Sequence, residues 1–253
     1  MTPHLSVEDF CRILKLYKYD VNTCRMLLEK MRNHGGIDYF LNYGPRRVYG
    51  ELRVVGVGFT GILLLASSTR GIVLTKIMRK DSRRKSMLYE CNITRTASSL
   101  GVSPRIYACD DEYIIMEYID GTSLAEYIEK YGELRSIYDL KLALKSILYK
   151  TFLLDYNHID HGELSRPYKH VLISPKGLFI IDFDSASLSR IPRNLTSILG
   201  GLFFRRNKFS RRLKDILCVT DKQLREVQTM IRYYKKHVNF DIVVQIIEKL
   251  KIF

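Results

Sequence analysis

The sequence predicts an α+β fold with a small β-rich part and a mostly helical part, preceded by a helical extension. Three successive residue patterns predict this fold, and they set domain bounds at 1–45, 46–117 and 118–253. The first segment carries two short helical patterns, the second alternates apolar strands with one helix, and the third has apolar residues at helical spacing. A chain of 253 residues is long enough to bury a core in one large domain or two small ones.

The extension over 1–45 begins with helix-capping residues. Ser6 lies three residues before an acid, and Asp20 is placed to cap a second helix that ends near Gly35. We expect both helices to pack against the next part of the chain. A small helical module that binds nucleic acid or a partner protein is the alternative.

A glycine-rich turn is predicted early in the β-rich part, at Gly56, Gly58 and Gly61. In a dinucleotide-binding unit this spacing joins a strand to a helix, but here residues 62–66 continue as a strand, which excludes that interpretation. A hairpin of glycines lets the backbone approach a phosphate closely. A hairpin with a purely structural role is the alternative.

Lys76 is predicted to lie in an apolar strand over 71–78. A lysine there needs a counter-charge, or it must extend its ammonium to solvent. Glu90 is the only acid in the helix predicted over 85–100. We therefore predict a Lys76–Glu90 ion pair that holds the ammonium ready for a phosphate.

The helical part carries the most specific group of residues. His161 and Glu163 follow a predicted buried helix, and Asp182 follows an apolar hairpin predicted over 171–181. A carboxylate on a loop can accept a hydroxyl proton, and a carboxylate at a strand end can hold Mg²⁺ between phosphates. Taken singly, His161 fits a core histidine and Asp182 fits a turn residue or a helix cap. Their order after the glycines and the lysine favours the chemical interpretation.

Two further helices are predicted towards the end of the chain, one opened by a capping box at Thr220.

Residues 46–253 resemble the protein-kinase-like fold, in the style of the small atypical kinases of archaea: the RIO group, the kinase of the tRNA-modifying KEOPS complex and the archaeal predicted Ser/Thr kinases. The resemblance implies a bilobal architecture, with a β-rich N-lobe over 46–117 and a helical C-lobe over 118–253. It implies ATP as the phosphate donor and Mg²⁺ or Mn²⁺ as the metal. The site residues that match the family pattern are Gly56, Gly58 and Gly61 over the triphosphate, Lys76 with Glu90, Met116, Glu117 and Ile119 at the adenine-binding hinge, His161 and Glu163 in the catalytic loop, and Asp182 on the metal.

The chain departs from the family pattern at three places. The catalytic-loop acid is Glu163 where the family has Asp, and its extra methylene displaces the carboxylate by ~1.5 Å, a shift that can cost ~10²-fold in rate. The family's metal-binding Asn corresponds to Tyr168 by count, or to His170 if the following strand sets the alignment; imidazole suits Mn²⁺ better than Mg²⁺. Asp184 replaces the glycine of D-F-G and adds a second carboxylate to the predicted metal site. An A-P-E motif, which belongs to a peptide-docking activation segment, is missing.

The net charge of +14 favours a polyanionic partner. Much of it lies in two basic clusters, at 79–85 and 205–214, for which RNA, a ribonucleoprotein or an acidic protein is the predicted partner. A solvated basic face is the alternative, and a membrane-surface helix is a weaker one. No apolar run approaches the ~20 residues that span a bilayer, and neither a secretory signal nor a CxxC pair is present. We therefore expect a cytoplasmic protein whose five cysteines are reduced.

The leading functional prediction is an atypical Ser/Thr protein kinase that transfers phosphate from ATP to a protein substrate and to itself. One alternative is a nucleotide-binding pseudokinase or scaffold on an RNA or ribonucleoprotein target, because of the departures at Glu163, His170 and Asp184. The other is a small-molecule kinase of the aminoglycoside-phosphotransferase type, although the helical part is short for the substrate-binding insert of that family.

Overall fold

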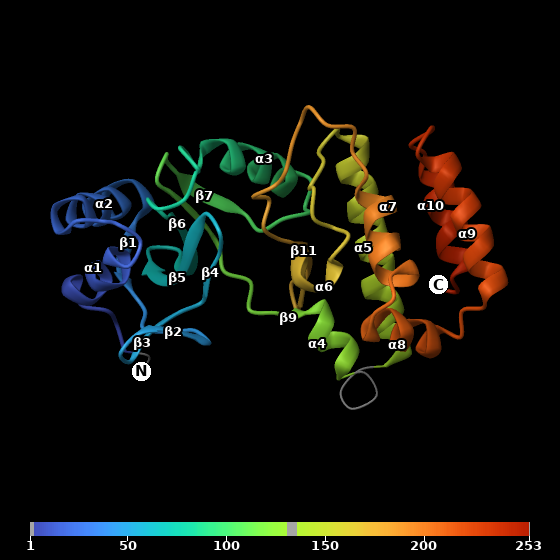
Figure 1. The fold of residues 1–253 in the computed structure, drawn as a ribbon, viewed down its shortest axis with the longest axis horizontal. Coiled ribbons are helices and arrows are strands. Elements are labelled where there is room, and N and C mark those ends of the chain that lie inside the picture. The colour runs from blue at the N-terminus through green and yellow to red at the C-terminus, as the bar shows by residue number, and fades with distance from the viewer. Residues whose placement is uncertain (1–2, 131–135, 253) are drawn as a thin grey trace. The chain divides into compact units, whose positions relative to one another are not determined.

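The chain forms two compact units in the computed structural model, which describes residues 3–130 and 136–252 (Figure 1). Unit 1 comprises Met1–Arg95 and Pro104–Tyr118, and unit 2 comprises Thr96–Ser103 and Ile119–Phe253. The predicted α+β class is confirmed, since antiparallel sheets and helices both contribute to the structure.

Unit 1 is an antiparallel sheet with helices. The sheet has the strand order β1-β5-β6-β8-β7, and β4 pairs with β5. A separate ribbon pairs β2 with β3. The elements are α1 (Val7–Lys15), α2 (Val21–Gly35), β1 (Ile37–Phe40), β2 (Arg46–Tyr49), β3 (Leu52–Val54), β4 (Gly56–Val57), β5 (Gly61–Ser68), β6 (Gly71–Met78), α3 (Leu88–Ser99), β7 (Ile106–Cys109) and β8 (Tyr113–Glu117).

The first two helices share one apolar core with this sheet. Ser6 and Asp20 cap α1 and α2 as predicted, and each side chain accepts a backbone N–H three residues on. The buried faces of the helices contribute side chains such as Phe10 and Met31, which belong to the same cluster as Ile62 of the sheet. Helices α1 and α2 thus pack against the sheet of unit 1, as expected from their amphipathic pattern.

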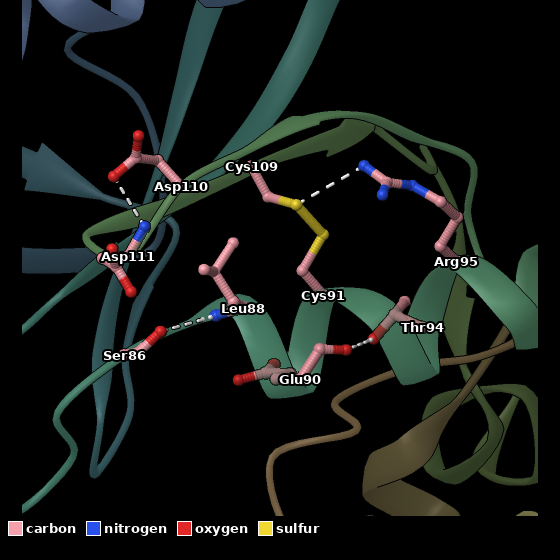
Figure 2. Close-up of a disulfide and its surroundings, with 9 residues drawn as sticks. All are labelled: Ser86, Leu88, Glu90, Cys91, Thr94, Arg95, Cys109, Asp110 and Asp111. Carbon is pink, nitrogen blue, oxygen red and sulfur yellow. Dashed lines mark hydrogen bonds between the residues drawn. A yellow bond between two sulfur atoms is a disulfide. The ribbon is translucent and has the colours of Figure 1, made fainter.

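Four of the five cysteines are paired, so the prediction of reduced thiols is wrong for these four. One disulfide, Cys11–Cys24, joins α1 to α2, and the other, Cys91–Cys109, joins α3 to β7 (Figure 2). Packing brings their Cα atoms to 5.7 and 6.4 Å, whereas the cysteine spacing in the sequence carries no recognisable pairing motif. Cys218 is the free, exposed thiol of the described chain. Disulfides alone do not decide the compartment, because intracellular proteins of hyperthermophiles also contain them.

Removal of the Cys91–Cys109 disulfide is expected to destabilise unit 1. The Cys91→Ser/Cys109→Ser variant should lose about 2–4 kcal/mol of unfolding free energy, because the crosslink no longer restricts the unfolded chain. Urea denaturation followed by circular dichroism measures the loss, with Cys218→Ser as the matched control that should leave stability unchanged. Five reactive thiols in the denatured, unreduced wild-type protein would contradict the pairing.

Unit 2 is mostly helical and contains a small antiparallel sheet of order β11-β10-β9. The long helix α5 buries apolar residues such as Leu144 and Leu148, and it contacts α7, α10 and β11. Ser136 and Thr220 open α5 and α9 through capping boxes. The elements are β9 (Thr122–Ser123), α4 (Leu124–Glu129), α5 (Ile137–Tyr156), α6 (Pro167–His170), β10 (Val171–Ser174), β11 (Gly177–Ile180), α7 (Asn194–Leu199), a π-helix (Gly200–Phe204), α8 (Lys208–Leu217), α9 (Asp221–Tyr234) and α10 (Phe240–Lys249).

The predicted hairpin over 171–181 is present as β10 and β11. Within residues 3–130 and 136–252, no helix is long and apolar enough to cross a lipid bilayer.

Candidate functional site

The glycine-rich turn joins β4 to β5 in unit 1. The Gly58 N–H donates to the Gly61 carbonyl at 2.8 Å, which closes the turn, and Arg79 donates to the Gly58 carbonyl at 2.9 Å. A Cβ on Gly61 would lie 2.9 Å from Cγ of Lys76, so glycine is needed there to leave room for the lysine side chain. Gly56 lies in β4, opposite Leu63. The three predicted glycines therefore surround a tight turn next to Lys76.

The predicted ion pair between Lys76 and Glu90 is present and buried. The Lys76 ammonium lies 2.6 Å from Oε1 of Glu90, and the two residues are 6% and 3% exposed. Strand β6 and helix α3 position them. Arg84 adds a second cation, 3.1 Å from Oε2 of Glu90, so one carboxylate contacts two positively charged groups. Burial of such a group costs desolvation energy, which makes it a candidate functional site rather than a simple source of stability.

The Cys91–Cys109 disulfide fixes the helix that carries Glu90. Figure 2 shows Cys91 facing β7, while Glu90 points away from the disulfide on another side of α3. Thr94 donates to the Glu90 carbonyl at 2.7 Å in the next turn. The crosslink thus anchors α3 to the sheet of unit 1 one residue away from the partner of Lys76.

The predicted hinge residues lie where the chain passes from unit 1 to unit 2. Met116 and Glu117 end β8, and Ile119, which is buried, is the first residue of the Ile119–Phe253 segment of unit 2. The Glu117 N–H donates to the Arg105 carbonyl at 2.8 Å. The Met116 side chain packs against the apolar cluster that contains Cys91. Adenine binding by these residues stays a prediction.

In unit 2, the Glu163 carboxylate contacts two side chains of its own chain. Oε1 accepts a hydrogen bond from the Ser185 hydroxyl at 2.5 Å, and Oε2 lies 3.2 Å from Nε2 of His170. His170 ends α6, and Ser185 lies in the loop after β11. Tyr168 instead donates to the Gly201 carbonyl at 3.0 Å. Of the two residues that the sequence left open, His170 is the one beside Glu163.

His161 is a buried, neutral imidazole. Burial lowers the pKa of His161 to about 4. Its Nε2 donates to the Ile181 carbonyl at 3.1 Å, which leaves Nδ1 to accept the Glu163 N–H at 3.4 Å. The ring also packs edge-on against Phe183, with 4.7 Å between centroids. His161 therefore holds the loop of Glu163 against the segment that follows β11, and its role in the structure is positional.

Of the residues predicted to bind a metal, Asp182 and His170 lie close to each other in the structure. Asp182 has a φ of +67°, and its side chain is 47% exposed. Its Oδ2 lies 4.0 Å from Nδ1 of His170, a buried nitrogen without a hydrogen-bond partner in the described chain. Asp184, which follows Asp182 by two residues in the sequence, is half-buried. Among residues 3–130 and 136–252, no group of three His, Cys, Asp or Glu side chains is arranged to hold a metal ion. One carboxylate and one imidazole nitrogen can hold a divalent cation if phosphate oxygens and water complete its shell, and this mixed donor set suits Mn²⁺.

A buried polar network supports the catalytic-loop segment. Asp155 of α5 is 2% exposed and accepts hydrogen bonds from the Asn194 backbone and side chain, the Leu195 N–H and the Tyr234 hydroxyl. Asn194 in turn accepts the His161 N–H at 2.9 Å. Burial raises the pKa of Asp155, and the hydrogen bonds it accepts act in the opposite direction.

Sequence reasoning missed Ser185, Asp155, Asn194 and the second cation Arg84. Their partners lie 22, 39, 33 and 6 residues away respectively. Single serine, aspartate and asparagine residues outside a motif carry no signal of such contacts. Arg84 was visible only as a member of the first basic cluster.

The two basic clusters differ in how many charges the protein itself uses. In the first, Arg79 pairs with Asp81, Lys80 lies 3.7 Å from Glu112, and Arg84 pairs with Glu90. The second surrounds a pocket of about 540 Å³ in unit 2, with four basic and no acidic lining residues: Phe203, Phe204, Arg205, Arg206, Arg211, Lys214 and Leu224. Within the second cluster, Lys208 also pairs with Glu129, and Arg212 donates to the Ile128 and Glu129 carbonyls. The pocket lined by four basic residues makes this cluster the better candidate for a polyanionic partner.

No protein-family model matches the chain. The chain is similar to the uncharacterized protein MJ1211 of Methanocaldococcus jannaschii, with 29% identity over 121 residues. The match covers 48% of this chain and 99% of that protein. Because that protein is uncharacterized, the function proposed below depends on the motifs and the geometry alone.

Proposed function

We propose that the protein is an atypical kinase that transfers a phosphoryl group from ATP to Ser/Thr hydroxyls. The observation that carries the proposal is the buried Lys76–Glu90 pair beside the glycine turn. An ammonium held by a carboxylate next to a turn of glycines can neutralise phosphate oxygens with little rearrangement, which is the main requirement of phosphoryl transfer.

The residues of unit 2 supply the remaining roles in the proposal. Glu163 accepts the proton of the acceptor hydroxyl, and His170 orients its carboxylate. Asp182, with His170, would hold Mg²⁺ or Mn²⁺. The bound cation supplies charge neutralisation of the phosphates. His161 keeps the Glu163 loop in place.

Phosphate transfer from labelled ATP, with Mg²⁺ or Mn²⁺, tests the proposal. Lys76→Met, Glu163→Gln and Asp182→Asn are each expected to lower the rate by at least about 10²-fold, because each removes charge or positioning that the transition state needs. Glu112→Gln, a partly exposed acid of unit 1, is the matched control and should keep the wild-type rate. Full transfer by Asp182→Asn would reject its role on the metal.

A nucleotide-binding scaffold is the second candidate, because Ser185 and His170 already contact both oxygens of Glu163. The two functions differ in one measurement. A scaffold shows a rise in Tm with ATP but no transfer to itself, to casein or to water. A kinase shows both, and the absence of both rejects nucleotide chemistry altogether.

A further inference from the structure

We propose that Ser185 is the hydroxyl that Glu163 activates, so that the chain phosphorylates itself at this residue. The inference rests on the proposed kinase function and names its first acceptor. The Ser185 Oγ donates to Oε1 of Glu163 at 2.5 Å, the contact that a general base makes with the hydroxyl it deprotonates.

The backbone holds Ser185 at this position. Gly162, the neighbour of Glu163, has a φ of +85°, and a Cβ there would lie 2.7 Å from the Ser185 carbonyl oxygen. Arg190 donates to the same carbonyl, and its Nε donates to Asp160 at 2.7 Å. Asp160 and Ser187 also exchange two backbone hydrogen bonds, of 2.9 and 2.8 Å. These contacts join the two loops on either side of the Ser185 hydroxyl.

The second oxygen of Glu163 is engaged as well. Nε2 of His170 lies 3.2 Å from Oε2, and the His170 side chain is 7% exposed. A hydroxyl from outside the chain would therefore have to share Oε1 with Ser185, or displace it, before Glu163 could deprotonate it. The hydroxyl already in place is the one that the base can activate first.

The position is accessible to a phosphoryl donor. Within unit 2, the Glu163 side chain is 36% exposed and that of Asp182 is 47% exposed, while Ser185 is half-buried. The next two serines are arranged differently, since the hydroxyls of Ser187 and Ser189 lie 3.1 Å from each other. Ser185 is thus singled out, and Ser189, which is exposed, provides a matched control.

The reaction balances without a further reagent. Glu163 takes the Oγ proton, and the Ser185 oxygen forms a bond to the γ-phosphorus of ATP. The bond from that phosphorus to the β,γ-bridging oxygen breaks, and ADP leaves with the electron pair. The products are phosphoserine at 185, ADP and the proton on Glu163, which then passes to water.

Peptide mass mapping of wild-type protein incubated with ATP and Mn²⁺ tests the inference. The expected result is phosphate on Ser185, at a rate per molecule that does not depend on protein concentration. Ser185→Ala should lower incorporation at least tenfold, and Ser185→Thr, which keeps a hydroxyl, should restore part of it. Ser189→Ala should stay within twofold of wild type. Circular dichroism and Tm without nucleotide confirm that each variant is folded.

Three results would overturn the inference. These are phosphate on other residues with none on Ser185, normal incorporation by Ser185→Ala, or a rate that rises in proportion to protein concentration. If wild type transfers phosphate to casein while Ser185 stays unmodified, the acceptor assignment fails and the kinase function stands. If wild type shows neither an ATP-dependent rise in Tm nor any transfer, the kinase function itself fails.

Discussion

Replacement of Glu90 by alanine is expected to lower the free energy of unfolding by about 3–5 kcal/mol. The carboxylate is 3% exposed and lies between the Lys76 ammonium at 2.6 Å and the Arg84 guanidinium at 3.1 Å. Without it, the buried ammonium loses this short ionic contact and cannot recover its hydration. Urea denaturation without nucleotide measures the loss, so the result does not depend on activity.

The double variant Lys76→Met/Glu90→Leu separates the cost of removing one member of the buried pair from the contribution of the whole pair. It should recover part of the stability lost in Glu90→Ala, since removal of both charges of a buried pair is often neutral, whereas Arg84 still loses its contact with Glu90. Glu112→Gln is the control, with an expected loss below about 1 kcal/mol because its ion pair is partly exposed. If Glu90→Ala is no less stable than Glu112→Gln, the buried pair is not formed in solution.

Replacement of Asp155 by alanine is expected to cost about 4 kcal/mol of unfolding free energy. The variant leaves four buried donors without their acceptor: the Asn194 N–H and amide, the Leu195 N–H and the Tyr234 hydroxyl. Because Asn194 also binds the His161 N–H, hydrogen exchange of the His161 amide should increase in the variant. Asp241→Asn, an exposed first-turn acid of α10, is the control and should change stability by less than about 1 kcal/mol.

Asp155 also makes the free energy of unfolding depend on pH, and its raised pKa fixes the direction of that dependence. Burial raises the pKa of Asp155 above its unfolded value, so the folded state binds more protons than the unfolded state in the interval between the two values. The contribution of Asp155 to stability is therefore complete below the unfolded pKa of about 3.9 and is lost as pH rises through the folded pKa. Wild type measured against Asp155→Asn should lose relative stability over this interval as pH increases. A constant difference between the two proteins would show that the pKa is not raised.

Much of the local structure was predictable because it depends on neighbouring residues. Apolar spacing and capping residues predicted α1, α2, α9 and the β10–β11 hairpin. The Lys76–Glu90 pair was also predictable, since a buried lysine in an apolar strand demands a counter-charge and the following helix offers a single acid. The kinase-like arrangement and the nucleotide chemistry stay predictions.

The sequence by itself determined the α+β class, several local elements such as α1, α2, α9 and the β10–β11 hairpin, and the charged pair of unit 1. Only the tertiary structure decided that Cys91 pairs with Cys109 and that the Ser185 hydroxyl donates a hydrogen bond to Glu163. It also decided that His170, rather than Tyr168, lies beside the Glu163 carboxylate. The physical reason is distance along the chain. Periodicity and capping arise from contacts within a few residues, whereas these contacts join loops and strands that only the packing of whole elements brings together.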